Sequence, residues 1–384
     1  MTTPPQHWPQ ATRELGLSSR LRLVTLPQRR FRSFREAVIG GLAGSREMPA
    51  LIRLPSMAWR ADYEDVSAHQ LLHLANKRRR GTRDVAVFIH GLMIDESCWK
   101  GAIDPFCNHV DSLLGWTPLF VRYNSGLHIS QNGALLADLL IELFEDWGDQ
   151  LGRIQLVGHS MGGLVARSCL EVLRQRNHSV LERVQRMFLL CTPNGGVEVE
   201  QLRYGVENGL RLVGELAPQL IESLLPSERA NPKLQDLAVR ALVRTTTTAA
   251  ASIPRALTSA ALWFVNFPSD GIRDVRFGYM QEEEWQLHQQ DELAFMTNHR
   301  RPLPPPEHVE TYALAASLWP TVSDTPSRVR NDGIVTVASV AAQTLDFDDL
   351  GLHAQDRFVE LPLLAHQMAP VSSRVAQQIE AWVR

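Results

Sequence analysis

Cysteine is scarce in this chain and follows no recognisable pattern. The four cysteines, Cys98, Cys107, Cys169 and Cys191, form no C-x-x-C pair and show no metal-ligand spacing, so neither a disulfide framework nor a zinc site is expected. Long apolar runs are missing too, since none reaches the roughly 18 residues that a membrane-spanning helix needs. The first residues lack a charged segment followed by an apolar one, which predicts no secretory signal. We therefore expect a cytoplasmic protein, with association at a membrane surface left open.

Net charge is also small, at −3 over 384 residues, which gives no support to a nucleic-acid partner. The charge is unevenly spread, because residues 1–83 hold 15 Lys/Arg against 6 Asp/Glu and the remainder holds 24 against 36. Such a basic arm is either a solvated face that covers the body or a contact for anionic lipid or a partner protein.

Apolar runs alternate with amphipathic stretches from residue 84 onward. The runs predict strands over residues 84–90, 117–123, 153–157, 186–191, 309–315 and 357–361, and helices over 65–80, 132–147, 162–176 and 371–383. Strands that are apolar throughout and separated by helices are typical of a parallel α/β sheet covered on both faces.

The middle of the chain breaks this alternation. Residues 197–308 combine an amphipathic stretch at 210–225, a Thr/Ala-rich stretch and a proline run at 302–306, which predicts a helical cap inserted into the core. The predicted organisation is a basic, partly helical N-terminal extension over 1–83, a core over 84–196 and 309–384, and a cap or lid over 197–308.

The clearest chemical signal is the pentapeptide G-H-S-M-G at residues 158–162, which matches G-x-S-x-G. A predicted strand precedes it and a predicted helix follows it, as in the nucleophile elbow that holds a serine clear of the end of a sheet. The flanking glycines fit because bulk would clash in so tight a turn. Ser160 is therefore the predicted nucleophile.

A serine hydroxyl needs a base to take its proton, and the base needs an acid that fixes its tautomer. In this type of fold the chain order is Ser, then Asp or Glu, then His. Asp332, in an Asp-Gly turn after the strand at 309–315, is the predicted acid, with Asp324 as the nearest alternative. His366, between the last strand and the last helix, is the predicted base, whereas His353 precedes that strand and is interpreted as a loop residue.

Two N–H groups should stabilise the oxyanion. Met161, directly after the nucleophile, and Leu92, after Gly91 in the loop behind the strand at 84–90, are the predicted donors, and His90 is predicted to be structural. Because loops at the carboxyl ends of parallel strands line ligand crevices, Gly91, His159, Tyr123 and Thr192 are predicted to contact substrate. For the loops at 123–126 and 192–196, ordinary turn chemistry is the alternative.

At this point the chain resembles a known family. The combination of H-G-L at 90–92, R-Y-N-S-G at 122–126, G-H-S-M-G-G-L-V-A-R at 158–167, T-P at 192–193 and D-G-I-V at 332–335 resembles bacterial α/β-hydrolases of the lipase/esterase type. It is similar above all to the group related to the GPI-inositol deacylase. The resemblance implies the α/β-hydrolase fold, Ser160, Asp332 and His366 as triad, and Leu92 with Met161 as oxyanion hole.

Two positions depart from the pattern of that family. Related lipases usually have Thr-Pro-His-x-Gly where this chain has Asn194, and Leu-Asp after the histidine where this chain has Gln367-Met368. Substrate varies within one fold far more than mechanism does, so the name of the group implies no substrate.

The predicted function is hydrolysis of a lipid-like carboxylic ester through an acyl-enzyme on Ser160, without a metal or organic cofactor. An acyltransferase with the same triad, a peptidase or amidase, and a non-catalytic lipid-binding protein are the alternatives. The predicted partners are the ester itself and a membrane surface contacted by the basic N-terminal region.

Overall fold

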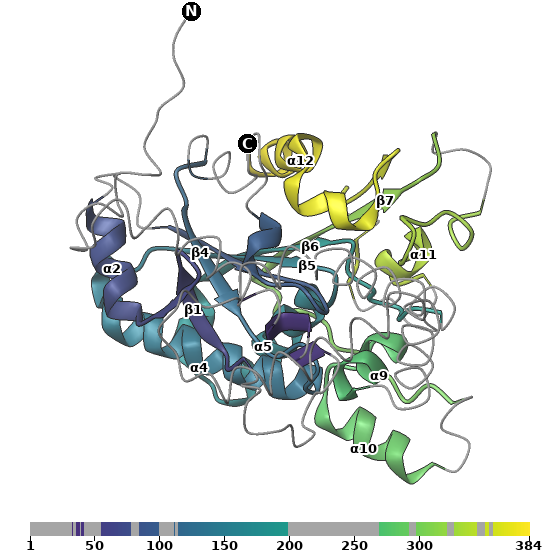
Figure 1. The fold of residues 1–384 in the computed structure, drawn as a ribbon, viewed down its shortest axis with the longest axis horizontal. Coiled ribbons are helices and arrows are strands. Elements are labelled where there is room, and N and C mark those ends of the chain that lie inside the picture. Colours follow the sequence, from purple (N-terminus) through teal and green to yellow (C-terminus); the bar gives the residue numbers. More distant parts are fainter. Residues whose placement is uncertain are drawn as a thin grey trace, which may run out of the picture.

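A computed structural model describes residues 33, 36–38, 40–41, 55–77, 84–99, 111, 114–198, 269–291, 297–320, 326–343, 350–352 and 356–384. Its centre is one eight-stranded sheet with the order β2-β1-β4-β3-β5-β6-β7-β8 (Figure 1). The strands are β1 Ala58–Ala61, β2 Glu64–Val66, β3 Val85–Ile89, β4 Thr117–Arg122, β5 Ile154–His159, β6 Val184–Leu190, β7 Glu310–Ser317 and β8 Phe358–Pro362. β1 pairs antiparallel with both β2 and β4, and every other pairing is parallel.

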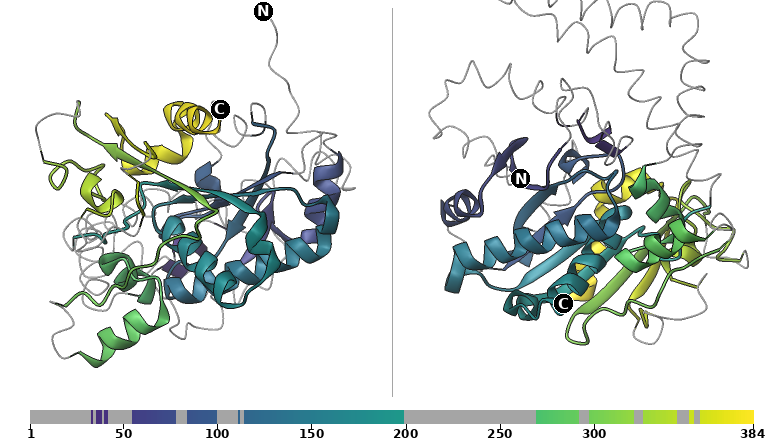
Figure 2. Two further views of the ribbon diagram at one scale, coloured as in Figure 1. Left: turned by 180° about the vertical axis from the view of Figure 1, so that it is seen from behind. Right: turned by 90° about the horizontal axis from the view of Figure 1, so that it is seen from below.

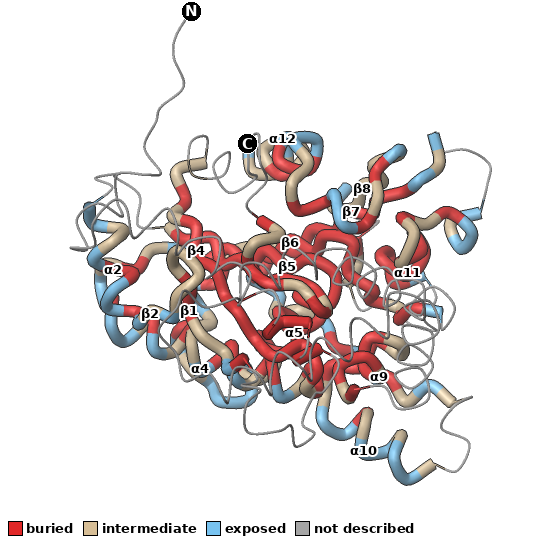
Figure 3. The backbone as a smooth tube through the Cα atoms, viewed as in Figure 1, coloured by how far each residue is buried: buried red, intermediate tan, exposed pale blue. Residues whose placement is uncertain are grey.

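Helices cover both faces of this sheet. The helices α2 (Ala68–Lys77), α4 (Ile129–Trp147) and α5 (Met161–Gln175) pack on one face, and α12 (Ser373–Val383) packs on the other. Seen from below, α4 and α5 lie side by side in front of the strands (Figure 2). The same layering puts buried residues along the central strands and exposed ones on the outer sides of α2 and α10 (Figure 3).

The central strand β3 shows why the apolar runs form strands. All five of its residues are fully buried. Val85, Val87 and Ile89 join the apolar cluster under α4 and α5, whereas Ala86 and Phe88 join the cluster under α12. A strand between two helical layers must be apolar on both sides, so the continuous run at 84–90 predicted this position correctly.

Residues 58–77 are part of the main sheet and its helical cover. The sequence predicted an N-terminal extension over 1–83, yet β1 pairs with β4 and its Trp59 is buried. Arg60 on β1 is buried as well, and its Nε donates to Glu96 Oε1 at 2.8 Å. The sequence did not predict β1 for two reasons. The strands β1 and β2 are short, and the charged Arg60 resembles a surface residue although its charge is paired inside the protein.

Part of the predicted cap region packs directly on the core. α9 (Asp270–Phe277) contributes Ile272 and Val275 to the cluster under α4 and α5, and α10 (Glu282–Gln290) follows it. Asp274 Oδ2 accepts the Ile129 N–H at 2.8 Å at the start of α4. The predicted helix at 210–225 lies outside the described residues, so the cap remains a prediction.

The mostly parallel sheet, its two helical layers and the strand–turn–helix around Ser160 together give the α/β-hydrolase fold, which confirms the predicted fold class. Among the described helices, none is long and apolar enough to cross a membrane.

Candidate active site

Ser160 lies in a strained turn between β5 and α5. β5 ends at His159, α5 begins at Met161, and Ser160 between them adopts φ 54° and ψ −126°. Backbone of this kind costs a non-glycine residue about 1–3 kcal/mol and persists only where the surroundings hold it. The Ser160 N–H donates to Leu190 O at 2.8 Å, which ties the turn to the end of β6.

Gly158 and Gly162 make the turn possible because the backbone segments next to them lie too close for a side chain. A Cβ on Gly158 would lie 2.5 Å from the backbone of Gly163, and a Cβ on Gly162 would lie 2.2 Å from Ile89 O. Both distances are far below van der Waals contact, so a side chain at either position would push α5 away from β3 and β5. The sequence spacing of the elbow is therefore dictated by packing.

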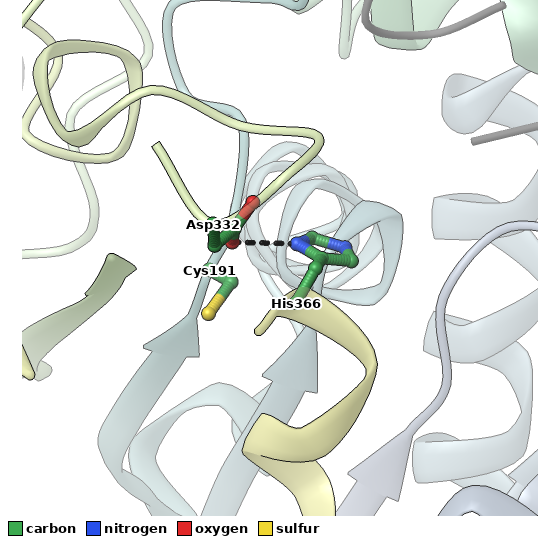
Figure 4. Close-up of side chains that lie close together, drawn as sticks. All are labelled: Cys191, Asp332 and His366. Atoms are coloured by element: carbon green, nitrogen blue, oxygen red, sulfur yellow. Dashed lines mark hydrogen bonds and ion pairs between the residues drawn. The ribbon is translucent and has the colours of Figure 1, made fainter. Parts of the chain in front are cut away.

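Asp332 and His366 form a tight acid–base pair (Figure 4). His366 Nδ1 donates to Asp332 Oδ2 at 2.7 Å, and the residues are 2% and 4% exposed respectively. The other carboxylate oxygen, Oδ1, accepts the N–H groups of Ile334 and Val335 at 3.0 and 2.8 Å. These bonds satisfy the buried carboxylate and aim it at the imidazole.

The loops of Asp332, the predicted acid, and His366, the predicted base, are joined to each other and to the turn that holds Ser160. The His366 N–H donates to Asp332 O at 3.0 Å. His159, which directly precedes Ser160, donates from Nε2 to His366 O at 3.1 Å, and the two imidazole centroids are 4.8 Å apart. Ser160, Asp332 and His366 thus come together at the carboxyl edge of the sheet from positions up to 206 residues apart in sequence.

The loop after β3 lies directly against Ser160, the predicted nucleophile. A Cβ on Gly91 would lie 3.0 Å from Ser160 Cβ. Among the described residues, no backbone carbonyl takes the Leu92 N–H, and the Met161 N–H belongs to the first turn of α5, where N–H groups have no partner inside the helix. Gly91, which precedes the predicted donor Leu92, thus lies against Ser160, and the other predicted donor, Met161, directly follows Ser160 in the chain.

His90 and Tyr123 hold that loop from behind. His90 Nδ1 donates to Gly91 O at 2.9 Å, its Nε2 accepts the Tyr123 N–H at 3.3 Å, and the two rings stack at 4.2 Å. Tyr123 Oη donates to His90 O at 2.7 Å. Burial lowers the pKa of His90 to about 4, so its imidazole is neutral, and both of its nitrogens are engaged in holding the loop.

Of the four residues predicted to contact substrate, Gly91 lies beside Ser160, and the other three are buried behind the site. Tyr123 is committed to His90, and Thr192 packs against α5, where a Cβ on Gly163 would lie 2.0 Å from Thr192 Oγ1. His159 is committed to His366. The competing candidates Asp324 and His353 lie outside the described residues.

Asn194, at the first position where the chain departs from the pattern of the family it resembles, has a structural role. Arg167 on α5 donates to Asn194 Oδ1 at 3.0 Å and to Leu303 O at 2.7 Å. Asn194 Nδ2 donates to Val340 O at 2.7 Å in α11 (Val337–Val340). The amide therefore joins three segments through its donor and its acceptor, as an imidazole with one proton also does.

Sequence reasoning missed two neighbours of the acid–base pair. Arg330, two residues before Asp332, makes a bidentate ion pair with Glu360 on β8 at 2.8–3.1 Å, and both side chains are almost fully buried. Cys191, at φ 50°, follows β6 and places its Sγ within 4.8 Å of the ligand atoms of Asp332 and His366 (Figure 4). Spacing carries no signal for either neighbour, because both are set by strands that are distant in sequence.

Cys191, Asp332 and His366 are the three described residues that have the spacing of a metal site. Metal binding at this cluster needs a Cys191 thiolate and a free carboxylate oxygen. Burial, followed by the charge of Asp332, raises the pKa of the Cys191 thiol well above its ordinary value, and both carboxylate oxygens of Asp332 already accept hydrogen bonds. The arrangement favours proton transfer over metal binding.

Comparison with known proteins points in the same direction. A family model described as "Putative serine esterase (DUF676)" matches residues 122–225, a stretch that contains Ser160 but neither Asp332 nor His366. This match supports a hydrolase of the esterase type. No curated protein matches the chain, and the finer resemblance to the GPI-inositol deacylase group stays a prediction.

Several solved structures are similar to the chain. The mature form of the Bacillus licheniformis lipase BlEst2 is 16% identical, with 78% of this chain and 91% of that one covered and a TM-score of 0.43. A thermophilic esterase from Thermogutta terrifontis is 18% identical over 79% and 90% of the two chains, with a TM-score of 0.35. The RedJ thioesterase of Streptomyces coelicolor is 15% identical over 79% and 90%, with a TM-score of 0.36. Because these identities and TM-scores are low, the assignment of the fold depends on the strand order described above and not on these similarities.

Proposed function

We propose that the protein is a serine hydrolase of carboxylic esters that works through an acyl-enzyme on Ser160. The observation that carries the proposal is the Asp332–His366 pair at 2.7 Å, whose base is joined by His159 to the turn that holds Ser160. Neither the Asp332–His366 pair nor the turn at Ser160 would support the proposal alone. Because the two are connected, an acid, a base and a nucleophile are available together for acyl transfer.

The proposed reaction has two steps. His366 Nε2 takes the Ser160 hydroxyl proton while Oγ attacks the ester carbonyl, and the N–H groups of Leu92 and Met161 stabilise the oxyanion. His366 then protonates the leaving alcohol. Water, deprotonated by His366, then attacks the acyl-enzyme, and His366 returns this proton to Ser160 Oγ as the bond between Oγ and the acyl carbon breaks and the acid leaves. Asp332 holds the Nδ1–H tautomer throughout.

Labelling with a fluorophosphonate, followed by peptide mass spectrometry, tests the proposal without a known substrate. We expect one label, on Ser160, that is lost in Ser160→Ala and slowed strongly in His366→Ala. The exposed Ser179 at the opposite edge of the sheet provides the control, because Ser179→Ala should label normally. No label on folded wild-type protein would contradict an activated serine, and transfer to an added alcohol would favour the acyltransferase.

An apolar rim around the acid and base loops favours an apolar ester. Among the described residues six large hydrophobic side chains are exposed, and four of them, Leu318, Val329, Leu363 and Met368, lie on the segments that carry Asp332 and His366. Backbone bonds join these segments, since Leu318 N–H donates to Asn331 O at 2.8 Å. Exposed apolar groups gathered at one place typically mark a binding surface.

The rim leads to a test of acyl-chain preference. Leu363 is 66% exposed, and covering it with an acyl chain is worth about 1 kcal/mol. Leu363→Ser should therefore lower kcat/KM for long-chain esters roughly fivefold and leave short-chain esters unchanged. Leu135→Ser, on the exposed side of α4, is the matched control. Equal effects on both chain lengths would contradict an acyl contact at the rim.

A further inference from the structure

His159 holds the peptide backbone of the candidate base from one side while Asp332 holds it from the other. The His366 N–H donates to Asp332 O at 3.0 Å, and the His366 carbonyl accepts from His159 Nε2 at 3.1 Å. The orientation of the His366 imidazole is fixed separately, through Nδ1 and the carboxylate. The base is thus held at three points, two of which belong to Asp332 and one to His159.

The partner of Nε2 defines the state of the His159 ring. A carbonyl oxygen only accepts, so Nε2 must carry the proton. Burial lowers the pKa of His159 well below its ordinary value, and the nearby His366 lowers it further. Its other nitrogen, Nδ1, is buried and has no hydrogen-bond partner among the described residues. The bond to His366 O is therefore the polar contact that compensates the burial of this imidazole.

The position of His159 next to Ser160 determines what the hydrogen bond from His159 Nε2 to His366 O connects. His159 is the last residue of β5, and Ser160 follows it in the strained turn. The hydrogen bond therefore connects the nucleophile's own turn to the loop of the base. In η7 (His366–Val371), the two residues that follow His366, Gln367 and Met368, are exposed.

We propose that His159 is a positioning residue that sets the distance between Ser160 and the His366 imidazole by anchoring the His366 carbonyl. The proposal rests on the acyl transfer proposed above and deepens it. It also replaces the predicted contact of His159 with substrate, because a side chain that is 1% exposed and committed to His366 presents no donor to a ligand. Misplacing a reacting group by about 1 Å costs on the order of 100-fold in rate.

Two amide variants separate the hydrogen bond from simple packing. His159→Gln carries its amide nitrogen to the position of Nε2, whereas the shorter His159→Asn reaches only the position of Nδ1. We expect kcat for a simple ester to fall at least tenfold in His159→Asn and to be mostly restored in His159→Gln, with KM within about twofold in both. The rate of fluorophosphonate labelling at Ser160 should follow kcat.

Measurements of unfolding by urea accompany both variants, and His159→Leu adds an apolar side chain of similar volume. A packing role would predict that activity follows stability, with Leu at least as active as Gln. Equal kcat in Gln and Asn, or a rise in KM at unchanged kcat, would overturn the positioning role while labelling of the wild type left the proposed function intact. Absence of labelling in the wild type would instead overturn the proposed function.

Discussion

The buried His90 should make the free energy of unfolding depend on pH in a definite direction. Its pKa in the folded protein is about 4, below the ordinary 6.5, mainly because burial disfavours the charged ring. Between these values the unfolded chain binds the proton and the folded chain does not, so stability falls as pH falls. The contribution is complete above pH 6.5 and is lost progressively down to pH 4, at about 3 kcal/mol in all and about 2 kcal/mol by pH 5.

Comparison with His90→Gln isolates this contribution from that of other groups. Glutamine stays neutral, and its amide oxygen reaches toward the Tyr123 N–H that His90 Nε2 accepts. The variant should be less stable than the wild type at pH 8, because it loses the ring stack. The difference in the free energy of unfolding between wild type and variant should narrow by about 2 kcal/mol at pH 5. Urea unfolding followed by tryptophan fluorescence measures it.

The exposed His69 on α2 provides a control for the substitution itself, with His69→Gln measured over the same pH range. A constant gap for His90→Gln from pH 8 to pH 5 would refute the reasoning. It would mean that the ring behind Gly91 takes up its proton as readily in the folded protein as in the unfolded chain. The hydrogen bonds described for both nitrogens of His90 would then be incorrect.

Three further substitutions test the geometry of the site. Asp332→Asn should lower kcat about 10⁴-fold with little change in KM, because an amide no longer favours the Nδ1–H tautomer; an effect below tenfold would argue against the triad. Gly163→Ala should destabilise by about 1–3 kcal/mol through its contact with Thr192, and Thr192→Ala should recover part of this loss in urea unfolding. Arg330→Gln should cost about 3–5 kcal/mol by leaving the Glu360 carboxylate buried and unpaired, whereas replacing both partners with Met and Leu should cost far less.

Strands and helices of the core were predictable because burial on two faces leaves a continuous trace in the sequence. The run predicted at 117–123 corresponds to β4, Thr117–Arg122, and the amphipathic stretch predicted at 132–147 to α4, which begins at Ile129. The elbow was predictable for a different reason. Its glycines are required by contacts within and next to one strand–turn–helix unit, so spacing alone reveals them.

The hairpin of β1 and β2 was not predictable in the same way. Its strands have four and three residues, too few for a periodic pattern, and Arg60 hides its burial behind a charge that Glu96 neutralises. The Arg330–Glu360 pair and the His159–His366 bond share this property. In both interactions the partners are distant in sequence and come together only through the order of the strands in the sheet. The residues around either partner therefore do not indicate the interaction.

The two buried histidines on either side of Ser160 link the function proposed here to stability. His90 holds the loop with the predicted oxyanion donor Leu92, and His159 holds the base. Both have a pKa lowered by burial, so protonation of either is favoured by an opening of the site that rehydrates its ring. Acid should therefore open the carboxyl edge of the sheet before it unfolds the apolar clusters under α5 and α12. Protection of the backbone amides in the loop after β3 against hydrogen exchange should consequently be lost at a higher pH than helical circular dichroism, and coincident losses would contradict this order.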